Sequence, residues 1–247
     1  MKKILETLKR KWAEYLLEII VLIIGILGAY SLNNWNETRK NKTTEIKIYK
    51  EIQDDLLVTY IDLKSDFDNH LFFLKRTRIV RDQMMYKKEY TDSISYFLST
   101  MDKGFQLFPK TTGFETLKSL GLGTLSNDSL RQSITNLFQL TLKRVTDRGK
   151  EEIKSSSISD LSPFIEKYLQ LDTTVNDYLQ INELDSISVY NHKFINYDDF
   201  INDDQFLFKV QKAIISRQLS IGSHSSAIIE LNATIHAIES ELKLLMN

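Results

Sequence analysis

The sequence predicts an all-α protein, in which one N-terminal transmembrane helix continues into a long helix and joins an antiparallel helical bundle with coiled-coil-like packing. An unrelieved apolar run lies near the start, and apolar residues recur at alternating steps of three and four in two long later segments. Only 8 glycines and 2 prolines occur in 247 residues, so few positions force a helix to end. We expect a short basic tail over residues 1–11, the transmembrane helix over 12–36 and a helical extramembrane domain over 37–247.

The composition argues against several classes of function. The formal net charge is −1 and the basic residues are spread along the chain, so no nucleic acid partner is expected. There is no cysteine, which excludes disulfides and thiolate metal ligands. No nucleotide-binding or hydrolase motif is present, and no two of the four histidines are three or four residues apart. We therefore expect no enzyme activity, no cofactor and no metal, and the sequence identifies no small-molecule substrate.

The apolar run from Ile19 to Leu32 is too short to cross a bilayer alone. Its 14 residues would span about 21 Å as a helix, whereas a hydrocarbon core of roughly 30 Å needs about 20 residues. The helix must therefore take in Glu18 at one end or Asn33 and Asn34 at the other. Four aromatic residues flank the run and predict anchors at the two bilayer interfaces: Trp12 and Tyr15 before it, and Tyr30 and Trp35 near its end.

One face of this helix predicts contact with another helix. Glu18, Leu22, Gly25 and Ala29 follow steps of four, three and four, so they share a face. Gly25 and Ala29 form a small-xxx-small pair that lets two transmembrane helices approach closely. Glu18 on the same face then points toward a helix neighbour, which predicts self-association. Two alternatives stay open: Glu18 reaches the headgroups, or it lines a proton path.

A cleaved signal peptide is the main alternative for this segment, because Ala29-Tyr30-Ser31 resembles a cleavage site. The long, amphipathic basic region before the run and the Asn-Asn-Trp-Asn sequence after it favour a retained span. Five basic residues precede the span closely and four follow it. Short basic tails usually stay in the cytoplasm, so we expect a bacterial inner-membrane protein with its N-terminus inside and its main domain outside.

Two segments resemble a known family. The opening combines Glu18-Ile19, Gly25-Ile26, Ala29 and Asn33-Asn34-Trp35-Asn36-Glu37-Thr38-Arg39-Lys40-Asn41. The middle carries Phe114-Glu115-Thr116-Leu117-Lys118-Ser119-Leu120-Gly121, followed by Ser126-Asn127-Asp128-Ser129-Leu130-Arg131. Together they resemble an uncharacterised bacterial family of small single-pass membrane proteins, a domain of unknown function. The resemblance covers most of the chain and implies membrane residence and helical content, but no catalytic activity.

A long helix is predicted from Glu37 to about Lys88, running directly out of the span. No glycine or proline interrupts it, and a 3.5-residue apolar stripe follows it: Ile46, Tyr49, Leu56, Tyr60, Leu63, Phe67, Leu74 and Met84. The opposite, polar face includes Lys64, Asp66 and Asp68, which we expect to be solvated.

Shorter elements follow in the middle of the chain. Residues 93–101 and 114–120 predict short helices, the second ended by Gly121, and Ser126 or Asn127 can cap a helix that runs to about Lys154. Residues 160–181 are interpreted as one or two helices, with Pro163 in a first turn. Residues 182–201 are interpreted as a mixed, aromatic connector.

The last segment carries the clearest heptad pattern. Asn202 is the expected N-cap, with acids in the first turn. Steps of three and four connect Leu207, Val210, Ile214, Arg217, Ile221, His224, Ile228, Leu231, Ile235, Ile238, Leu242 and Leu245. This helix matches the long membrane-proximal one in length, so we expect the two to pack antiparallel, with the C-terminus returning toward the membrane.

The antiparallel register predicts a polar layer. If Ile46 faces Leu245, then His70 faces Ile221 and lies within a turn of His224. Two histidines that meet inside a bundle could sense pH or hold a metal. The alternative is a pair of satisfied histidines that only sets the register.

These features predict a membrane-anchored helical scaffold or interaction protein that self-associates through its transmembrane helix. Its expected partners are the lipid bilayer and either further copies of itself or another membrane protein. The alternative is an accessory or pore-forming subunit of a transport or motor complex that uses Glu18.

Overall fold

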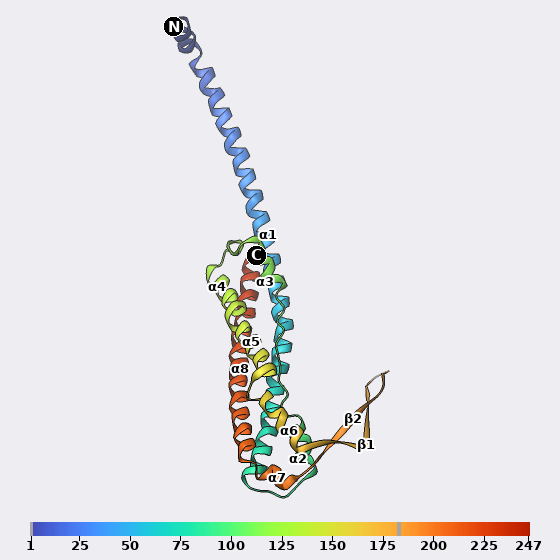
Figure 1. The fold of residues 1–247 in the computed structure, drawn as a ribbon. Helices are drawn as coiled ribbons and strands as arrows, with labels where there is room; N and C mark the ends of the chain where they lie inside the picture. Colours follow the sequence, from blue (N-terminus) through green and yellow to red (C-terminus); the bar gives the residue numbers. More distant parts are fainter. Residues whose placement is uncertain (1, 182–183) are drawn as a thin grey trace.

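A computed structural model describes residues 2–181 and 184–247 (Figure 1). The elements are α1 Lys2–Met85, α2 Asp92–Ser99, α3 Thr112–Leu120, η1 Leu122–Thr124, α4 Asp128–Asn136, the π-helical η2 Leu137–Leu142, α5 Lys143–Ser155, η3 Ser159–Leu161, α6 Ser162–Tyr168, β1 Leu169–Ile181, β2 Leu184–Phe194, α7 Tyr197–Ile201 and α8 Asp204–Met246. The chain is mainly helical, which agrees with the predicted all-α class.

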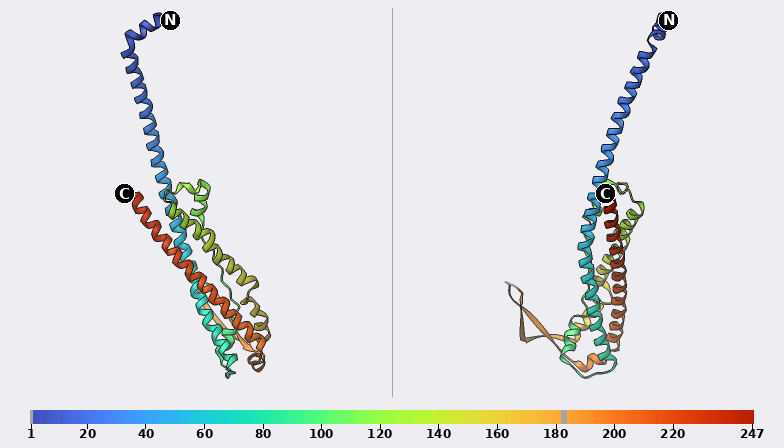
Figure 2. Two further views of the ribbon diagram at one scale, coloured as in Figure 1. Left: turned by 90° about the vertical axis from the view of Figure 1, so that its left-hand side faces the viewer. Right: turned by 180° about the vertical axis from the view of Figure 1, so that it is seen from behind.

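Helix α1 is one unbroken element of 84 residues, about 126 Å long at 1.5 Å per residue. Near its N-terminal end, α1 contains an apolar stretch that is long enough to cross a membrane. From Leu16 to Thr43 its side chains are exposed, and this half stands clear of the other elements (Figures 1 and 2). From Leu16 onward, the first buried side chain is that of Glu45. The prediction that the apolar run and the following helix form a single rod is confirmed.

The rest of the molecule, residues 45–247, is called the helical body below. Helix α8 runs antiparallel beside the second half of α1, and the C-terminus lies where α1 enters the body (Figures 1 and 2). This end is called the proximal end, and the end that carries α2, α6 and α7 is called the distal end. All twelve predicted heptad positions of α8 are buried or half-buried, so the predicted core stripe is confirmed. Coiled-coil packing itself stays a prediction.

The helix starts and stops follow local sequence signals. The α8 cap is Asp203, whose carboxylate accepts a hydrogen bond from the Phe206 N–H, so the predicted cap at Asn202 is wrong by one residue. Asn127 caps α4 by accepting from the Leu130 N–H at 3.0 Å. Helix α3 ends at Gly121, which has φ of +96°.

A β-hairpin replaces the predicted helix over residues 169–181. β1 pairs antiparallel with β2, starting with Leu169 opposite Phe194 and Leu171 opposite His192. The local sequence is compatible with strands, because residues 186–190 alternate around Ile187 and Val189 and Thr173-Thr174-Val175 is β-branched, although these last three residues lie at a register shift. The hairpin extends away from the distal end of the body (Figure 1).

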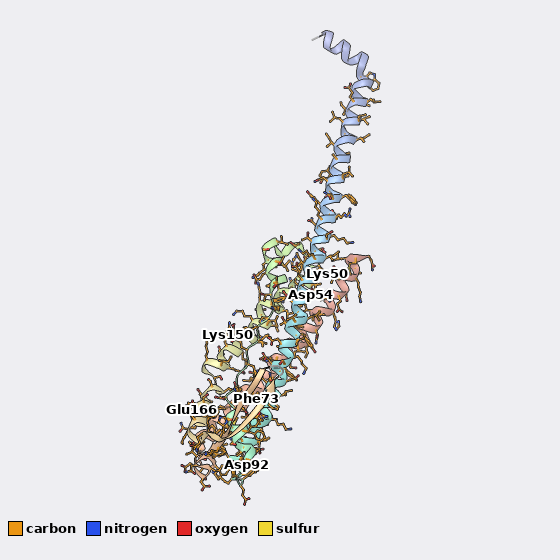
Figure 3. All side chains as sticks on the ribbon, turned by 90° about the vertical axis from the view of Figure 1, so that its right-hand side faces the viewer. Lys50, Asp54, Phe73, Asp92, Lys150 and Glu166 are labelled. Carbon is orange, nitrogen blue, oxygen red and sulfur yellow. The ribbon has the colours of Figure 1, made fainter. Side chains whose placement is uncertain are left out.

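The body contains two apolar cores along its length. The proximal core joins α1, α3, α4 and α8 and includes Tyr49, Leu56, Phe114, Leu231 and Ile238. The distal core includes Met84, Leu98, Phe200, Phe206 and Val210. Figure 3 shows the side chains along this axis, with Lys50 near the proximal end and Asp92 near the distal end. Between the two cores lies a set of buried polar side chains.

Candidate functional site

The buried polar layer is built from three helices. It is defined by Asp66 and His70 of α1, Glu152 of α5, and Arg217, Ser220 and His224 of α8, all of which are buried. In both long helices these residues lie on the core stripe or at its edge, at the level where the apolar residues of the two cores stop. The same periodicity that forms the cores therefore places polar groups in the interior.

The two histidines meet inside this layer. The ring centroids of His70 and His224 are 4.9 Å apart, and the Phe105 ring contacts His70 edge-on at 5.2 Å. Nδ1 of His224 lies 2.8 Å from the Ser220 carbonyl oxygen, one turn earlier in the same helix. The antiparallel register inferred from the two stripes brings these residues together.

A carboxylate reaches the layer from the third helix. Glu152 accepts a hydrogen bond from the Ser220 hydroxyl, and its Oε2 lies 3.7 Å from Nε2 of His70. Burial raises the pKa of Glu152 above its usual range. Glu152 was not predicted, although Leu142, Val145, Gly149 and Glu152 follow the three-four spacing of a core-facing stripe.

Arg217 connects the layer to the loop after α2. Its guanidinium donates to the carbonyl oxygens of Met101 at 2.7 Å and Lys103 at 2.8 Å, and it lies 5.3 Å from the centroid of the Phe73 ring, labelled in Figure 3. Burial lowers its pKa to about 10, opposed by the charge of Glu152. Arg217 therefore remains a cation at neutral pH, and its positive charge opposes the rise in the pKa of Glu152.

Burial also controls the charge of the histidines. It lowers the pKa of His70 to about 3, with further lowering from His224 and Arg217, and it lowers the pKa of His224. Both rings are consequently neutral at pH 7. Among residues 2–181 and 184–247, no group of three His, Cys, Asp or Glu side chains could hold a metal ion.

Asp66 corrects a prediction. It was expected on the solvated face with Lys64 and Asp68, but it is buried, whereas those two form an exposed ion pair at 2.5 Å. Burial, followed by the charges of Asp62 and Glu152, raises the pKa of Asp66 to about 6. The 3.5-residue spacing identifies the centre of the buried stripe but does not identify its edges.

Several polar atoms in this layer have no hydrogen-bond partner within the part of the chain that the structure describes. They are both ring nitrogens of His70, Nε2 of His224, Nε and Nη1 of Arg217, Oε2 of Glu152 and Oδ2 of Asp66. Unpaired buried polar groups destabilise a fold. The stability of the fold should therefore change when a group in this layer is protonated or when a charged side chain in it is replaced.

Replacing Asp66 with asparagine tests this sensitivity. Because its folded pKa of about 6 lies above the ordinary 3.8, Asp66 favours folding at low pH, and that contribution is lost as pH rises through 6. At about pH 8, we expect the free energy of unfolding of Asp66→Asn to be higher than that of the parent by on the order of 1–3 kcal/mol. Near pH 4 the two should converge. His70 titrates in the opposite direction in both proteins, so its effect cancels.

The measurement is urea unfolding of the detergent-solubilised full chain, followed by circular dichroism at both pH values. An equal difference between the two proteins at both pH values would contradict the prediction. Asp68→Asn, on the exposed face, is the matched control.

The predicted transmembrane face lies on the free half of α1. Glu18, Leu22, Gly25 and Ala29 are all exposed, and no atom in the described parts of the chain lies within 4 Å of a Cβ added at Gly25. The predicted aromatic anchors Trp12, Tyr30 and Trp35 are also exposed, while the side chain of Tyr15 lies outside the described residues. Arg39 stacks over the Trp35 ring at 5.8 Å.

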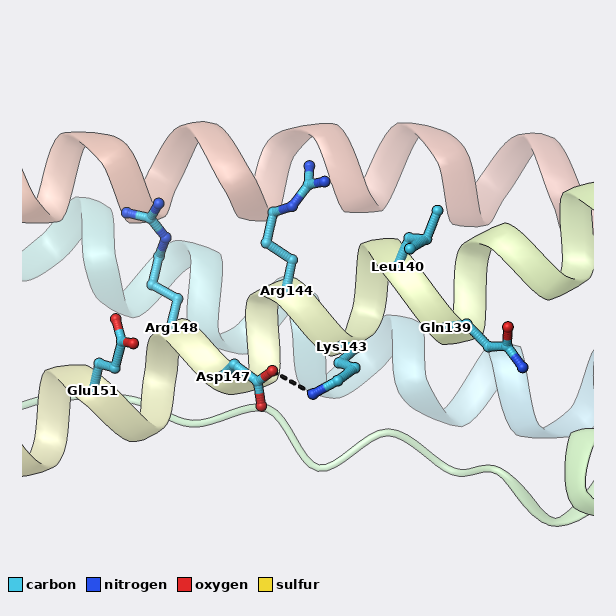
Figure 4. Close-up of a pocket in the computed structure, with 7 residues that line it drawn as sticks. All are labelled: Gln139, Leu140, Lys143, Arg144, Asp147, Arg148 and Glu151. Carbon is cyan, nitrogen blue, oxygen red and sulfur yellow. Dashed lines mark hydrogen bonds and ion pairs between the residues drawn. The ribbon is translucent and has the colours of Figure 1, made fainter.

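A surface pocket lies on α5 outside the buried polar layer. In Figure 4, Arg144 and Arg148 extend toward α8, and Lys143 pairs with Asp147 at 2.5 Å. Arg148 lies close enough to Glu152 to oppose the rise in its pKa. The pocket is lined mainly by charged side chains of α5, with Gln139 and Leu140 of η2, and we assign it no ligand.

These features define the class of protein. It is an all-α protein whose first helix is apolar enough to cross a membrane and continues into a helical body. The chain belongs to the family of unknown function DUF6090, whose model matches residues 18–187. That range contains residues 18–36 of the predicted span, the second half of α1 and most of the hairpin, but not α8. No curated protein and no solved structure matches the chain.

Proposed function

We propose that this protein is a membrane-anchored helical scaffold, with residues 12–36 as its transmembrane helix and 37–247 as its extramembrane domain. The observation that carries the proposal is the continuity of α1, which runs from the exposed apolar half to the core of the body without a break. A flexible linker would uncouple body from anchor, whereas an unbroken helix fixes their relative geometry. Such a protein positions its distal end at a set distance from the bilayer.

The compartment follows from the charge bias beside the span. We place the N-terminal tail in the cytoplasm and the body outside the inner membrane of a bacterium. The long body tolerates translocation despite Arg39, Lys40 and Lys42, because large domains translocate largely regardless of their charge.

Self-association through the face of Glu18, Leu22, Gly25 and Ala29 is the second part of the proposal. The absence of any atom near an added Cβ at Gly25, within the described residues, supports a face that is open to a neighbouring helix. In lipid, small residues allow close backbone packing, and a partner helix can shield a carboxyl group from hydrocarbon.

Replacing Gly25 with leucine is expected to convert an oligomer in lipid nanodiscs into a monomer, because the larger side chain prevents close approach of two helices. Ser31→Leu is the matched control: it also enlarges a small exposed side chain, but about a third of a turn away from Gly25, and it should retain the oligomer. Native mass spectrometry measures the stoichiometry. A monomeric parent protein would contradict self-association through this face.

The variant Glu18→Gln distinguishes the proposed scaffold from the alternative, a proton-conducting subunit. We expect this variant to keep the oligomer, and the parent protein to give no proton flux in liposomes that contain a pH-sensitive dye. A flux that is present in the parent and lost in Glu18→Gln, with the oligomer intact, would favour the transport alternative.

A further inference from the structure

The proximal end of the body lies at a fixed distance from the predicted bilayer interface. Trp35, the interface anchor, precedes Asn41 by six residues, which is about 9 Å along the helix. The headgroup region of a bilayer extends roughly 5–8 Å beyond the hydrocarbon core on each side. The level of Asn41 is therefore at the outer edge of the headgroups if α1 crosses the membrane.

One loop of the body lies at this level. A tip formed by residues 120–124 joins α3 to α4 and lines a pocket with Asn41 and Glu45 of α1. The N–H and hydroxyl of Ser126 donate to Oε1 of Glu45 at 2.7 and 2.8 Å, which fixes the loop to α1. In Figures 1 and 2 this loop and the C-terminus form the end of the body nearest the free half of α1.

The tip has a defined shape. It is a single 3-10 turn, Leu122–Thr124, with Gly121 at φ of +96° before it. The Thr124 hydroxyl donates to the Gly121 carbonyl oxygen at 2.7 Å, and the Leu125 N–H donates to that of Leu122 at 3.3 Å. The turn therefore satisfies part of its own backbone while presenting its side chains outward.

Four exposed apolar side chains lie at this end. Leu120 is 56% exposed and Leu122 is 37% exposed in the tip, and at the C-terminus Leu244 is 71% and Met246 56% exposed. Single exposed apolar residues are ordinary on protein surfaces. Four at the one end that faces a bilayer match the apolar contacts by which peripheral segments enter its interface.

The charges around the tip fit the same partner. Arg39, Lys40 and Lys42 are exposed on α1 and Lys243 is exposed on α8, and Glu37 is the exposed acid beside them. The acidic groups nearby are partly occupied: Glu115 pairs with Lys118 at 2.7 Å, and Glu241 accepts from Asn127 at 2.6 Å. Basic residues close to a membrane surface are attracted to anionic phospholipid headgroups.

We propose that residues 120–124, together with Leu244 and Met246, insert into the headgroup interface of the bilayer that α1 leaves, giving the body a second membrane contact. This inference rests on the proposed transmembrane span. The second contact would hold the body against the leaflet, so that α1 and the tip together fix its orientation, which a single helix cannot do because it can rotate and tilt.

The absence of cysteine makes the test direct, because each single-cysteine variant carries one label. Full-length Leu120→Cys, Ile24→Cys and Phe208→Cys are labelled with a fluorophore and placed in nanodiscs of phosphatidylcholine, phosphatidylglycerol and a shallow doxyl-labelled lipid. Phe208 is the matched control, since it is 57% exposed but lies at the distal end of α8. We expect at least about twofold quenching at positions 120 and 24 and none at position 208.

Each other result has a single meaning. Quenching at position 24 but not at position 120 would overturn the second contact while leaving the span intact. No quenching at position 24 would overturn the span, and the inference with it. Leu122→Glu in the labelled Leu120→Cys protein should abolish quenching at position 120 without altering it in Ile24→Cys, and unchanged quenching at position 120 would overturn the role of the tip.

Discussion

Replacing Arg217 with methionine is expected to lower the free energy of unfolding by about 3–5 kcal/mol, since it removes the buried positive charge that stabilises the ionised form of Glu152. The side chain of Arg217 is fully buried, and its two hydrogen bonds to the carbonyl oxygens of Met101 and Lys103 would also be lost. Methionine preserves most of the volume of arginine, so the loss measures charge and hydrogen bonding and not a cavity. Urea unfolding of the detergent-solubilised full chain, monitored by circular dichroism, gives the value.

A surface charge provides the control. Lys64→Met removes one member of the exposed Lys64–Asp68 pair and should change the free energy of unfolding by less than about 1 kcal/mol. Combining Arg217→Met with Glu152→Gln should recover part of the loss, because the carboxyl group that Arg217 stabilised in its ionised form is then also absent. A double variant as unstable as the sum of the two single variants would show that the two side chains are not coupled.

The two long helices could be predicted because periodicity alone determines which of their faces is buried. The stripe from Ile46 to Met84 and the heptads from Leu207 to Leu245 both coincide with buried or half-buried positions. Their similar lengths imply antiparallel pairing, and that pairing places His70 against His224. In this part of the fold the core-facing residues of each helix are determined by its own sequence.

The other parts of the site depend on contacts that a single helix does not encode. Glu152 enters the polar layer from α5. The rotation of α5 about its axis and its position along α1 and α8 depend on tertiary packing, which its own sequence does not determine. Asp66 lies at the edge of the α1 stripe, where its burial depends on neighbouring elements such as α5, whose Glu152 is close enough to raise its pKa. The β-hairpin was missed because its apolar residues also fit a helix, and pairing between β1 and β2 decides the outcome.

The polar layer has a consequence for specificity. The two apolar cores lie one after the other along two long helices. If only apolar residues lay between these helices, α8 could shift by one turn along α1 at a small cost in free energy. Buried polar groups that pair only in one alignment penalise such shifts, as a single polar residue does in coiled coils. The contact of His70 with His224 and the approach of Glu152 to His70 then fix one register, at the expense of several unpaired polar atoms.

Gly113 tests how closely α3 must approach α1. A Cβ at Gly113 would lie 2.6 Å from the backbone nitrogen of Ile52 and 2.7 Å from the backbone carbon of Glu51, so a helix backbone would have to move. The Gly113 N–H also donates to Oδ2 of Asp55 at 2.7 Å, which requires the same close approach. We expect Gly113→Ala to lower the free energy of unfolding by about 3 kcal/mol, the upper part of the usual range for overpacking.

Gly222→Ala makes the same chemical change with the opposite expected sign. Gly222 lies within α8, and in the described parts of the chain nothing lies within 4 Å of an added Cβ. Alanine should therefore raise the free energy of unfolding by about 1 kcal/mol through its higher helix propensity. Thermal unfolding of the two variants and the parent measures both changes in stability. If both variants were stabilised, backbone entropy, and not the contact between α3 and α1, would determine the effect of Gly113→Ala. A lowered stability confined to Gly113→Ala would instead locate the cause in the contact with Ile52 that positions α3, and through α3 the tip at residues 120–124.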